Sequence, residues 1–388
     1  MELYGYTKTS QYTMKILHIY AGNLFGGIET LLVTLEKERN LCMQMQPHFA
    51  LCFEGRLANE LRSLDANVHL LGNVRISRPW TIWKARVQLQ QLLKREQFDV
   101  VICHSCWPQA IFGPVIRSNH LPLIFWCHDV PNGKHPLERW AKRVIPDLVI
   151  ANSLYTQAAV PKLYPKVNSD TLYLPVACGD IGNDSSIRHA VRAELNTPDD
   201  AIVIIQVSRL ERWKGQSMLL SALAQLRDLS GWNYWIVGGV QRPHEAEYLQ
   251  ELEVQAQQLG VSDRVLFLGQ RNDVPRLLAA ADIHCQPNTG AEPFGIAFVE
   301  ALYASLPIVT TAMGGAVEIV DDSCGRVVAP NDINALSEVL GLLISNPSER
   351  ATLAAGGKLR AEYLCNPQRQ LTQLYNLLST LQKAEVVV

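Results

Sequence analysis

Two glutamates lie eight positions apart in an apolar stretch, AEPFGIAFVEALYASLPIVTT, which covers residues 291–311. Burying an ionised carboxylate costs free energy unless the group is paired or hydrogen-bonded. Glu292 and Glu300 are therefore either exposed or placed to hold a ligand. Pro293 suits the first position of a helix, which predicts a helix over residues 294–303, with Glu292 in the loop before it and Glu300 about two turns inside it.

Gly295 leaves the backbone amides at the start of this helix open to a phosphate group. A ligand that spans the helix start could place hydroxyl groups against both carboxylates and its phosphates between them. A sugar nucleotide has this layout, because its hexose and its ribose flank a diphosphate. The stretch therefore predicts a sugar-nucleotide site.

Two cations follow the apolar run AIVIIQV in the segment SRLERWKGQ, residues 208–216. Arg209 and Lys214 would lie on a short loop between the carboxyl end of a strand and the start of a helix. Two cations in this position can bind a diphosphate. A solvated charged loop is the alternative.

A glycine pair, Gly26 and Gly27, lies in AGNLFGGIET, between the first predicted strand and a helix. Glycine allows the backbone to approach a ligand closely, and the helix amides beyond it favour an anion. The spacing matches neither GxGxxG nor a Walker A motif. A plain tight turn is the alternative.

These residues need a scaffold of parallel strands. Short apolar runs alternate with amphipathic helical segments along the chain, beginning with MKILHIY at residues 14–20. This pattern predicts two consecutive α/β domains with doubly wound parallel sheets, in which ligands bind at the carboxyl ends of the strands. The predicted parts are a loose leader (1–13), a first domain (14–175), a polar linker (176–200), a second domain (201–365) and a C-terminal helix (366–388).

The composition excludes several classes of protein. Of the 388 residues, 48% are hydrophobic and 19% charged, as in a folded globular chain. The net charge of −2 argues against a nucleic-acid binder that relies on a basic surface. The nine cysteines show no disulfide framework, and we expect neither a secretory signal nor a transmembrane helix, so the expected location is the cytoplasm. The motif CHSC (103–106) lacks the second pair that a zinc site needs.

Several motifs, in this order along the chain, resemble those of the retaining GT-B glycosyltransferases (glycosyltransferase family 4, glycosyl transferases group 1). They are the glycine pair at Gly26, the SRL-to-KG element (208–215), EPFG with a second glutamate eight positions after the first, and IVTTAMGGAVEIV (308–320). The resemblance runs to GRVVAPND at residues 325–332. It implies two Rossmann-like domains facing across a cleft, with the C-terminal helix crossing back to the first domain.

The resemblance also implies roles for single residues. Glu292 would contact the hydroxyls of the donor hexose and Glu300 those of the ribose, while Arg209 and Lys214 would neutralise the diphosphate. Glu318 would support the donor loop. His128, at the end of an apolar strand, would face the donor sugar, and His104 is the second candidate. The expected catalytic residues are His128, Arg209, Lys214 and Glu292; the expected donor-binding residues are Gly26, Gly27, Arg209, Lys214, Gln270, Arg271, Asn272, Glu292, Pro293, Phe294, Gly295, Ile296 and Glu300.

We therefore expect a retaining, metal-independent hexosyltransferase without a cofactor, with UDP-glucose as the first candidate donor and GDP-mannose as the second. A glycan or a lipid-diphosphate-linked acceptor, in bacterial cell-surface polysaccharide synthesis, is the expectation from the family. The basic amphipathic segment 131–146 could contact an anionic membrane, or be an ordinary solvated helix. A catalytically idle GT-B protein that binds a nucleotide sugar or a protein partner is one alternative. A dinucleotide-dependent oxidoreductase is another, although GxGxxG is missing after either first strand.

Overall fold

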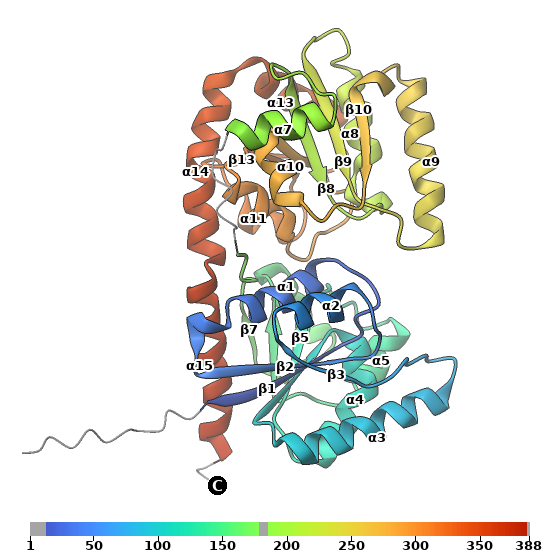
Figure 1. Cartoon of the computed structure of the whole chain (residues 1–388), viewed down its shortest axis with the longest axis vertical. Coiled ribbons are helices and arrows are strands. Elements are labelled where there is room, and N and C mark those ends of the chain that lie inside the picture. The colour runs from blue at the N-terminus through green and yellow to red at the C-terminus, as the bar shows by residue number, and fades with distance from the viewer. Residues whose placement is uncertain (1–12, 178–184, 386–388) are drawn as a thin grey trace, which may run out of the picture. The chain divides into compact units, whose positions relative to one another are not determined.

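The computed structural model describes residues 13–177 and 185–385, so residues 1–12 of the predicted leader lie outside it. The chain divides into two compact units, which we describe separately (Figure 1). Among the described residues, unit 1 comprises the chain up to Ala151, Ala159–Leu172 and the chain from Pro367. Unit 2 comprises Asn152–Ala158 and Tyr173–Asn366.

Unit 1 is built on a parallel sheet. In the described part of the chain its strand order is β3-β2-β1-β4-β5-β6-β7. The order reverses between β1 and β4, and in such sheets the crevice for a ligand opens at this point of reversal. The strands are β1 (Met14–Tyr20), β2 (Met45–Leu51), β3 (Asn67–Leu70), β4 (Val100–His104), β5 (Leu123–Cys127), β6 (Leu148–Ala151) and β7 (Ser169–Thr171).

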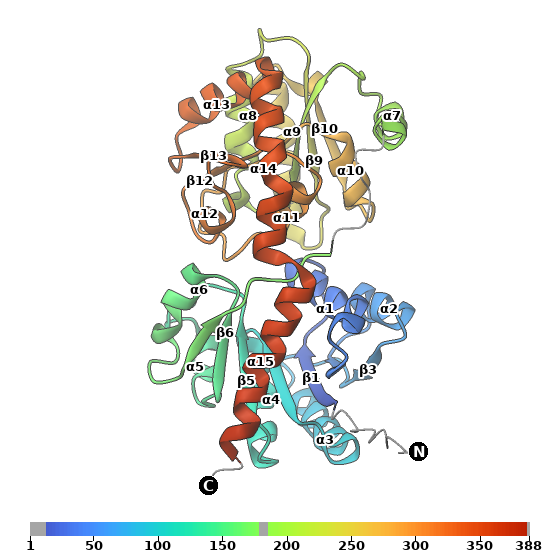
Figure 2. The ribbon, with the colours of Figure 1, turned by 90° about the vertical axis from the view of Figure 1, so that its left-hand side faces the viewer.

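Helices cover both faces of this sheet, as the continuous apolar strands require. Apolar side chains of α3 and α4 pack with those of β1 and β4 in one core cluster. The last helix, α15 (Figure 2), also belongs to unit 1. Its Gln368 side chain donates a 2.8 Å hydrogen bond to the Leu41 carbonyl. The helices are α1 (Gly27–Lys37), α2 (Arg56–Ser63), α3 (Pro79–Glu96), α4 (Cys106–Ser118), α5 (Pro136–Ala141) and α15 (Pro367–Glu385), while α6 (Leu154–Ala159) belongs to unit 2 except for its last residue.

Unit 2 repeats the same strand order. Its described strands form a parallel sheet in the order β10-β9-β8-β11-β12-β13, with the reversal between β8 and β11. The strands are β8 (Ile202–Val207), β9 (Trp232–Val237), β10 (Val265–Gly269), β11 (Ile283–Gln286), β12 (Ile308–Thr311) and β13 (Gly325–Val328). The predicted fold class, two doubly wound parallel-sheet domains, is confirmed.

The helices of unit 2 include one inside the predicted linker. Helix α7 lies within residues 176–200, where the buried Arg192 guanidinium donates to the Ala280 carbonyl (3.0 Å) and to Asp282 (2.7 Å). This part is not a plain linker: Arg188 also donates to the Ala280 carbonyl and to Asp282, and Val191 of the same helix is fully buried. The helices are α7 (Ser185–Glu194), α8 (Gln216–Ala224), α9 (Pro243–Gln258), α10 (Val274–Ala280), α11 (Ile296–Tyr303), α12 (Ala316–Ile319), α13 (Ile333–Ser345) and α14 (Pro347–Cys365).

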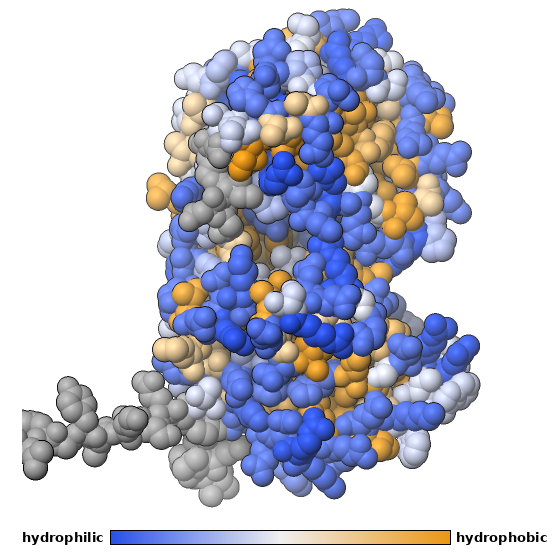
Figure 3. All heavy atoms as spheres, viewed as in Figure 1, coloured by the Kyte–Doolittle hydropathy of each residue, from blue (hydrophilic) through white to orange (hydrophobic). Residues whose placement is uncertain are grey.

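The outer surface seen in Figure 3 is mostly hydrophilic, with apolar side chains in small groups. The core of unit 2 gathers large side chains from the strands, among them Trp232, Tyr234 and Ile236 of β9, against α8, α9 and α13. This packing holds the carboxyl ends of the parallel strands, and the loops that follow them, along one edge of the sheet.

Candidate active site

The Glu292 carboxylate is the centre of a polar cluster in unit 2. Its side chain is only 9% exposed and that of Lys214 11%. Lys214 Nζ donates to Glu292 Oε2, and Gln286 Nε2 donates to the same oxygen over 3.1 Å. An ammonium and an amide thus offset the cost of burying the carboxylate. The structure brings together two residues that we had assigned to different parts of a donor, and it adds Gln286, which we had not singled out.

The close packing of two loops delivers Lys214 to this cluster. The loops follow β8 and β11, the two strands at the point of reversal in the sheet. Thr289 N donates to the Trp213 carbonyl over 2.8 Å. Gly215 has φ +77°, and a Cβ on it would lie 1.9 Å from the Pro287 carbonyl oxygen. Only glycine fits there, so the KG dipeptide joins a cation to a point of loop contact.

The helix after Glu292 begins later than predicted. Helix α11 starts at Ile296 rather than at residue 294, because Gly295 takes a left-handed φ of +98°. A Cβ on Gly295 would lie 2.4 Å from the Phe298 ring. Since Gly295 has no side chain, no side chain caps α11 and its first amides are left for water or a ligand. Pro293 lies in the loop before the helix and not at its first position.

Glu300 is the fifth residue of α11, a little more than one turn inside the helix. Its side chain is half-buried, and in the described part of the chain its carboxyl group has no hydrogen-bond partner. Burial raises the pKa of Glu300 to about 7. The two glutamates of the opening stretch therefore differ: Glu292 is paired, whereas Glu300 lacks a partner that would stabilise its charge.

The glycine pair Gly314–Gly315 lets the loop after β12 lie against Glu292. Gly314 has φ +69°, and a Cβ on it would lie 2.2 Å from the Glu292 carbonyl oxygen. Gly315 N donates to the same oxygen over 2.7 Å.

Glu318 supports a different segment from the expected donor loop. Its carboxylate accepts hydrogen bonds from the backbone N–H groups of Leu154 (2.8 Å) and Tyr155 (2.7 Å) and from the Tyr173 hydroxyl (2.9 Å). Nearby, the Ser153 hydroxyl donates to the Pro293 carbonyl over 2.5 Å. These bonds hold residues 152–158 in unit 2, beside the loop of Glu292.

Arg209 lies on the loop after β8, but its charge is already paired. Its guanidinium contacts Glu211 over 2.5 Å, with the arginine side chain 36% exposed. The glycine pair after β9, Gly238 and Gly239, lies between this loop and Gln270. A Cβ on Gly238 would lie 2.0 Å from the Ser208 carbonyl oxygen, and one on Gly239 would lie 2.5 Å from Gln270 Cβ.

The other two residues of the turn after β10 differ from each other. Arg271 is bound by Asp273 and by Glu194, each over 2.8 Å, so its guanidinium holds the turn itself. Asn272 is exposed. Of the expected donor-binding residues in this turn, Gln270 thus lies against Gly239, while Arg271 has a structural contact.

In unit 1, both candidate histidines belong to one hydrogen-bonded chain. His18 Nδ1 lies 3.0 Å from His104 Nε2, and His104 Nδ1 lies 2.9 Å from His128 Nε2. All three rings are buried, and the ring of Trp126 stacks on those of His104 and His128. Burial lowers the pKa of His18 and of His128 to about 3, and that of His104 well below its ordinary value, so the rings are neutral at pH 7.

Neutral rings in such a chain share one tautomer. Each neutral imidazole carries a single N–H, so it can donate to one neighbour only if its other nitrogen accepts. Either all three rings are protonated at Nδ1 or all three at Nε2. His104 therefore determines which His128 nitrogen carries the proton. Three adjacent strands bring these rings together, and sequence spacing cannot show that adjacency.

The predicted glycine pair of unit 1 starts a helix. Gly26 is the residue before α1 and Gly27 is its first residue, with no side chain capping the helix. The Gly26 carbonyl accepts hydrogen bonds from the backbone and the hydroxyl of Thr30, both over 3.0 Å. The helix start at these glycines is confirmed, while ligand contact there remains a prediction.

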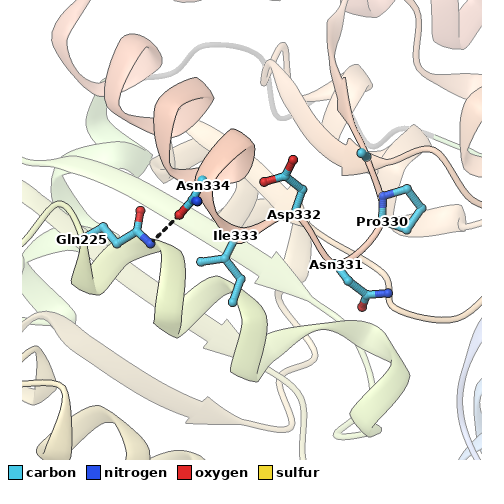
Figure 4. Close-up of a pocket in the computed structure, with 7 residues that line it drawn as sticks. Gln225, Pro330, Asn331, Asp332, Ile333 and Asn334 are labelled. Carbon is cyan, nitrogen blue, oxygen red and sulfur yellow. Dashed lines mark hydrogen bonds between the residues drawn. The ribbon is translucent and has the colours of Figure 1, made fainter.

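An open hollow on unit 2 lies away from these groups. It is lined by Gln225 and residues 329–334, and Gln225 donates to Asn334 over 3.0 Å (Figure 4). Asp332 in its wall caps α13 by accepting from Ala335 N over 2.9 Å. Since these polar groups hold α8 and α13 and no predicted site residue lines the hollow, we assign it no catalytic role.

The basic segment 131–146 packs part of its apolar surface against unit 1, although Ile145 is exposed. Its helix α5 is six residues long, and Trp140 and Val144 pack against the core of unit 1. Across residues 13–177 and 185–385, no helix is long and apolar enough to cross a membrane. The same residues contain no cluster of three or more His, Cys, Asp or Glu that could hold a metal ion.

Comparison with known proteins covers both units. Residues 25–174 match the family described as Glycosyltransferase Family 4, and residues 188–360 match Glycosyl transferases group 1. The human alpha-1,3/1,6-mannosyltransferase ALG2 is 25% identical over 74% of this chain and 75% of its own length. A GDP-mannose-dependent alpha-(1-6)-phosphatidylinositol monomannoside mannosyltransferase of Mycolicibacterium smegmatis is 28% identical over 70% of this chain and 74% of its own length.

Solved structures agree with this assignment. The Anabaena protein Alr3699/HepE in complex with UDP-glucose superimposes with a TM-score of 0.84 at 25% identity, over 95% of this chain and all of that one. The lipopolysaccharide glycosyltransferase WaaG shares the fold, with a TM-score of 0.70 at 21% identity over 92% of this chain and 98% of its own. With matching profiles over both units and a shared two-domain fold, the chain belongs to the group 1, family 4 glycosyltransferases and has the GT-B fold.

Proposed function

We propose that this glycosyltransferase moves a hexose from a nucleotide sugar, with UDP-glucose as the first candidate donor, to a glycan or lipid-linked acceptor with retention of configuration. Synthesis of a bacterial cell-surface polysaccharide is the process that we infer. The observation that carries the proposal is the cluster at the start of α11. This cluster combines three features: the ion pair of Glu292 and Lys214, the uncapped backbone amides of α11, and Glu300, whose carboxyl group has no partner in the described part of the chain.

Each group in this cluster suits one part of a sugar nucleotide. Glu292, oriented by Lys214 and Gln286, would accept hydrogen bonds from hexose hydroxyls. Lys214 and Arg209 would share their charge with the diphosphate, beside the amides of α11. Positive groups held in place before the reaction stabilise the leaving nucleoside diphosphate without rearrangement. Ribose hydroxyls would give Glu300 the hydrogen bonds that it lacks.

Retention would follow from attack on the face that the diphosphate leaves. The acceptor oxygen forms the new bond to the anomeric carbon as the bond to the phosphate oxygen breaks, and that phosphate oxygen takes the acceptor's proton. Glu292 suits a positioning role better than a nucleophilic one, because Lys214 and Gln286 already occupy its carboxylate. Arg209 and Lys214 would supply the positive charge that a metal ion supplies elsewhere, so we propose transfer without a metal or cofactor.

His128 is the residue of unit 1 that we propose to face the donor hexose. As a neutral ring it can donate or accept one hydrogen bond without adding charge beside a cationic, oxocarbenium-like sugar. His104 would set which of the two it does, through the shared tautomer.

Two donors have support from similar proteins. The Anabaena structure contains UDP-glucose, whereas the mycobacterial relative is named GDP-mannose-dependent. Calorimetric titration with UDP, GDP, UDP-glucose and GDP-mannose in the presence of EDTA would separate them. We expect micromolar binding of UDP and UDP-glucose, with the binding of UDP-glucose at least tenfold weaker in Glu292→Gln, and transfer that EDTA does not reduce.

The result also separates transfer from mere binding. If only GDP and GDP-mannose bound tightly, GDP-mannose would replace UDP-glucose as the proposed donor, and the proposed transfer reaction would stand. Binding without hydrolysis or transfer of the sugar would favour a catalytically idle protein. If none of the four nucleotides bound, the proposal would be wrong.

A further inference from the structure

Helix α3 of unit 1 exposes two tryptophans. Trp80 is 58% exposed and Trp83 65%, and Val87, one turn further on, is 38% exposed. Ile76, in the loop before the helix, is 45% exposed. A tryptophan buries a large area when it is covered, so an uncovered pair one turn apart needs an explanation.

These side chains form a second apolar stripe, separate from the one that holds α3 in the fold. At 100° per residue, Trp80, Trp83 and Val87 lie within about 60° of each other on the helix surface. The side chains that pack into the core, Ala85 and Leu89, lie on the opposite side. The exposed stripe is therefore not a frayed part of the core contact.

The loop before α3 is tied to the helix. The Thr81 hydroxyl lies 2.7 Å from the Arg78 carbonyl and 3.0 Å from the Arg75 backbone nitrogen, from which it accepts. Val74, just before this loop, is buried in the core of unit 1. These contacts hold Ile76 and the two arginines beside the first turn of α3.

The charged residues around the stripe are all basic. From residue 66 to residue 95 the chain contains six Lys or Arg and no Asp or Glu, although the whole chain has a net charge of −2. Arg75, Arg78 and Lys84, which surround the tryptophans, are exposed, and none of them forms an ion pair with any described residue. Of the basic residues further along, Arg86 donates to the Ile111 carbonyl and Arg95 pairs with Glu96.

We propose that the start of α3 and its preceding loop form a docking surface for an anionic lipid bilayer. Tryptophan favours the boundary between head groups and acyl chains, and nearby Lys and Arg side chains bind anionic head groups. Ile76 and Val87 extend the stripe with aliphatic groups, which would gain from acyl chains and little from stacking on sugar rings. This surface is a better candidate than segment 131–146, where Trp140 and Val144 pack against the core of unit 1 and, of the large apolar side chains, only Ile145, at 61%, is largely exposed. The inference rests on unit 1 alone and not on the donor.

Vesicle flotation of the full chain tests the proposal. We expect binding to phosphatidylcholine vesicles containing 30% phosphatidylglycerol at low salt, and little binding to pure phosphatidylcholine. Trp80→Ser/Trp83→Ser should weaken binding about tenfold or more. Lys84→Gln should weaken it about fivefold, as expected for the loss of one charge near an anionic surface. Raised salt should reduce binding by the wild-type protein.

A matched control removes two exposed apolar side chains from unit 2. Leu359→Ser/Tyr363→Ser on α14, where the two are 74% and 62% exposed, should bind vesicles like the wild type. Nucleotide affinity and the melting temperature should be unchanged in the tryptophan variant, so its result does not depend on the donor site. The proposal is overturned if both double variants bind vesicles equally well, or if the wild type binds a soluble anionic polysaccharide but no vesicles.

Discussion

Replacing Glu300 by glutamine should stabilise the free enzyme and weaken its binding of a nucleotide sugar. Burial raises the pKa of this carboxyl from 4.5 to about 7. Its ionisation therefore opposes folding, and at 1.36 kcal/mol per pH unit the difference is at most about 3.4 kcal/mol. Because the side chain is only half-buried, water screens part of this cost, and we expect Glu300→Gln to raise the free energy of unfolding by about 1–2 kcal/mol at pH 8.

The size of this stabilisation depends on pH. In the unfolded chain Glu300 loses its proton near pH 4.5, whereas in the folded chain it keeps the proton up to about pH 7. The wild type therefore loses stability between these two values, and the amide does not. The difference between the variant and the wild type should be close to zero at pH 4.5 and constant above about pH 8.

Chemical denaturation at pH 4.5 and pH 8, followed by tryptophan fluorescence, measures this difference. Glu338→Gln is the matched control, because Glu338 is an exposed carboxylate on α13 of the same unit and should show no change. Calorimetry at pH 8 should show nucleotide binding at least tenfold weaker in Glu300→Gln, since one charged hydrogen-bond partner is lost. A variant that is less stable than the wild type at pH 8, or equally more stable at both pH values, would refute the reasoning.

Three further predictions concern other contacts. Lys214→Met leaves the Glu292 carboxylate buried without its cation and should lower the free energy of unfolding, measured by chemical denaturation, by about 3–5 kcal/mol. The double variant Lys214→Met/Glu292→Gln should recover most of this loss. If the effects of the two substitutions were simply additive, the pairing would be contradicted. Glu318→Ala removes the acceptor for two backbone N–H groups and a hydroxyl, so it should lower the free energy of unfolding by about 2 kcal/mol. Tyr173→Phe removes only the hydroxyl and should lower it by about 1 kcal/mol. Equal losses in the two variants would mean that the two backbone hydrogen bonds contribute nothing. Unit 1 should lose stability as the pH falls below 6.5, because its three chained histidines are neutral when folded and protonated when unfolded; circular dichroism that stays unchanged down to pH 4 would count against this.

Local pattern predicted most of the scaffold. The apolar run at residues 14–20 is β1 without a change in its bounds, and the run AIVIIQV at residues 201–207 contains β8, which begins one residue later. Continuous apolar strands need helices on both faces, so the fold class followed from alternation alone. Strand β7 was missed, because its three residues, Ser169–Thr171, are polar and form an edge strand.

The residue types at the site were also visible in the sequence, but their partners were not. That Glu292 and Lys214 bind each other depends on the meeting of two loops 78 residues apart, which the strand order and Gly215 make possible. The start of α11 moved because the conformation of Gly295 overrode the preference of Pro293 for a first helical position.

What the sequence determined by itself was therefore the set of elements and the kinds of side chain at their ends, because both depend on periodicity and composition over a few residues. Only the tertiary structure decided which of those side chains pair, which are buried and which remain exposed. The chain of His18, His104 and His128, and the uncovered Trp80 and Trp83, both depend on which strands and helices become neighbours. Neighbours of this kind are selected by packing over the whole unit, and no short stretch of sequence contains that information.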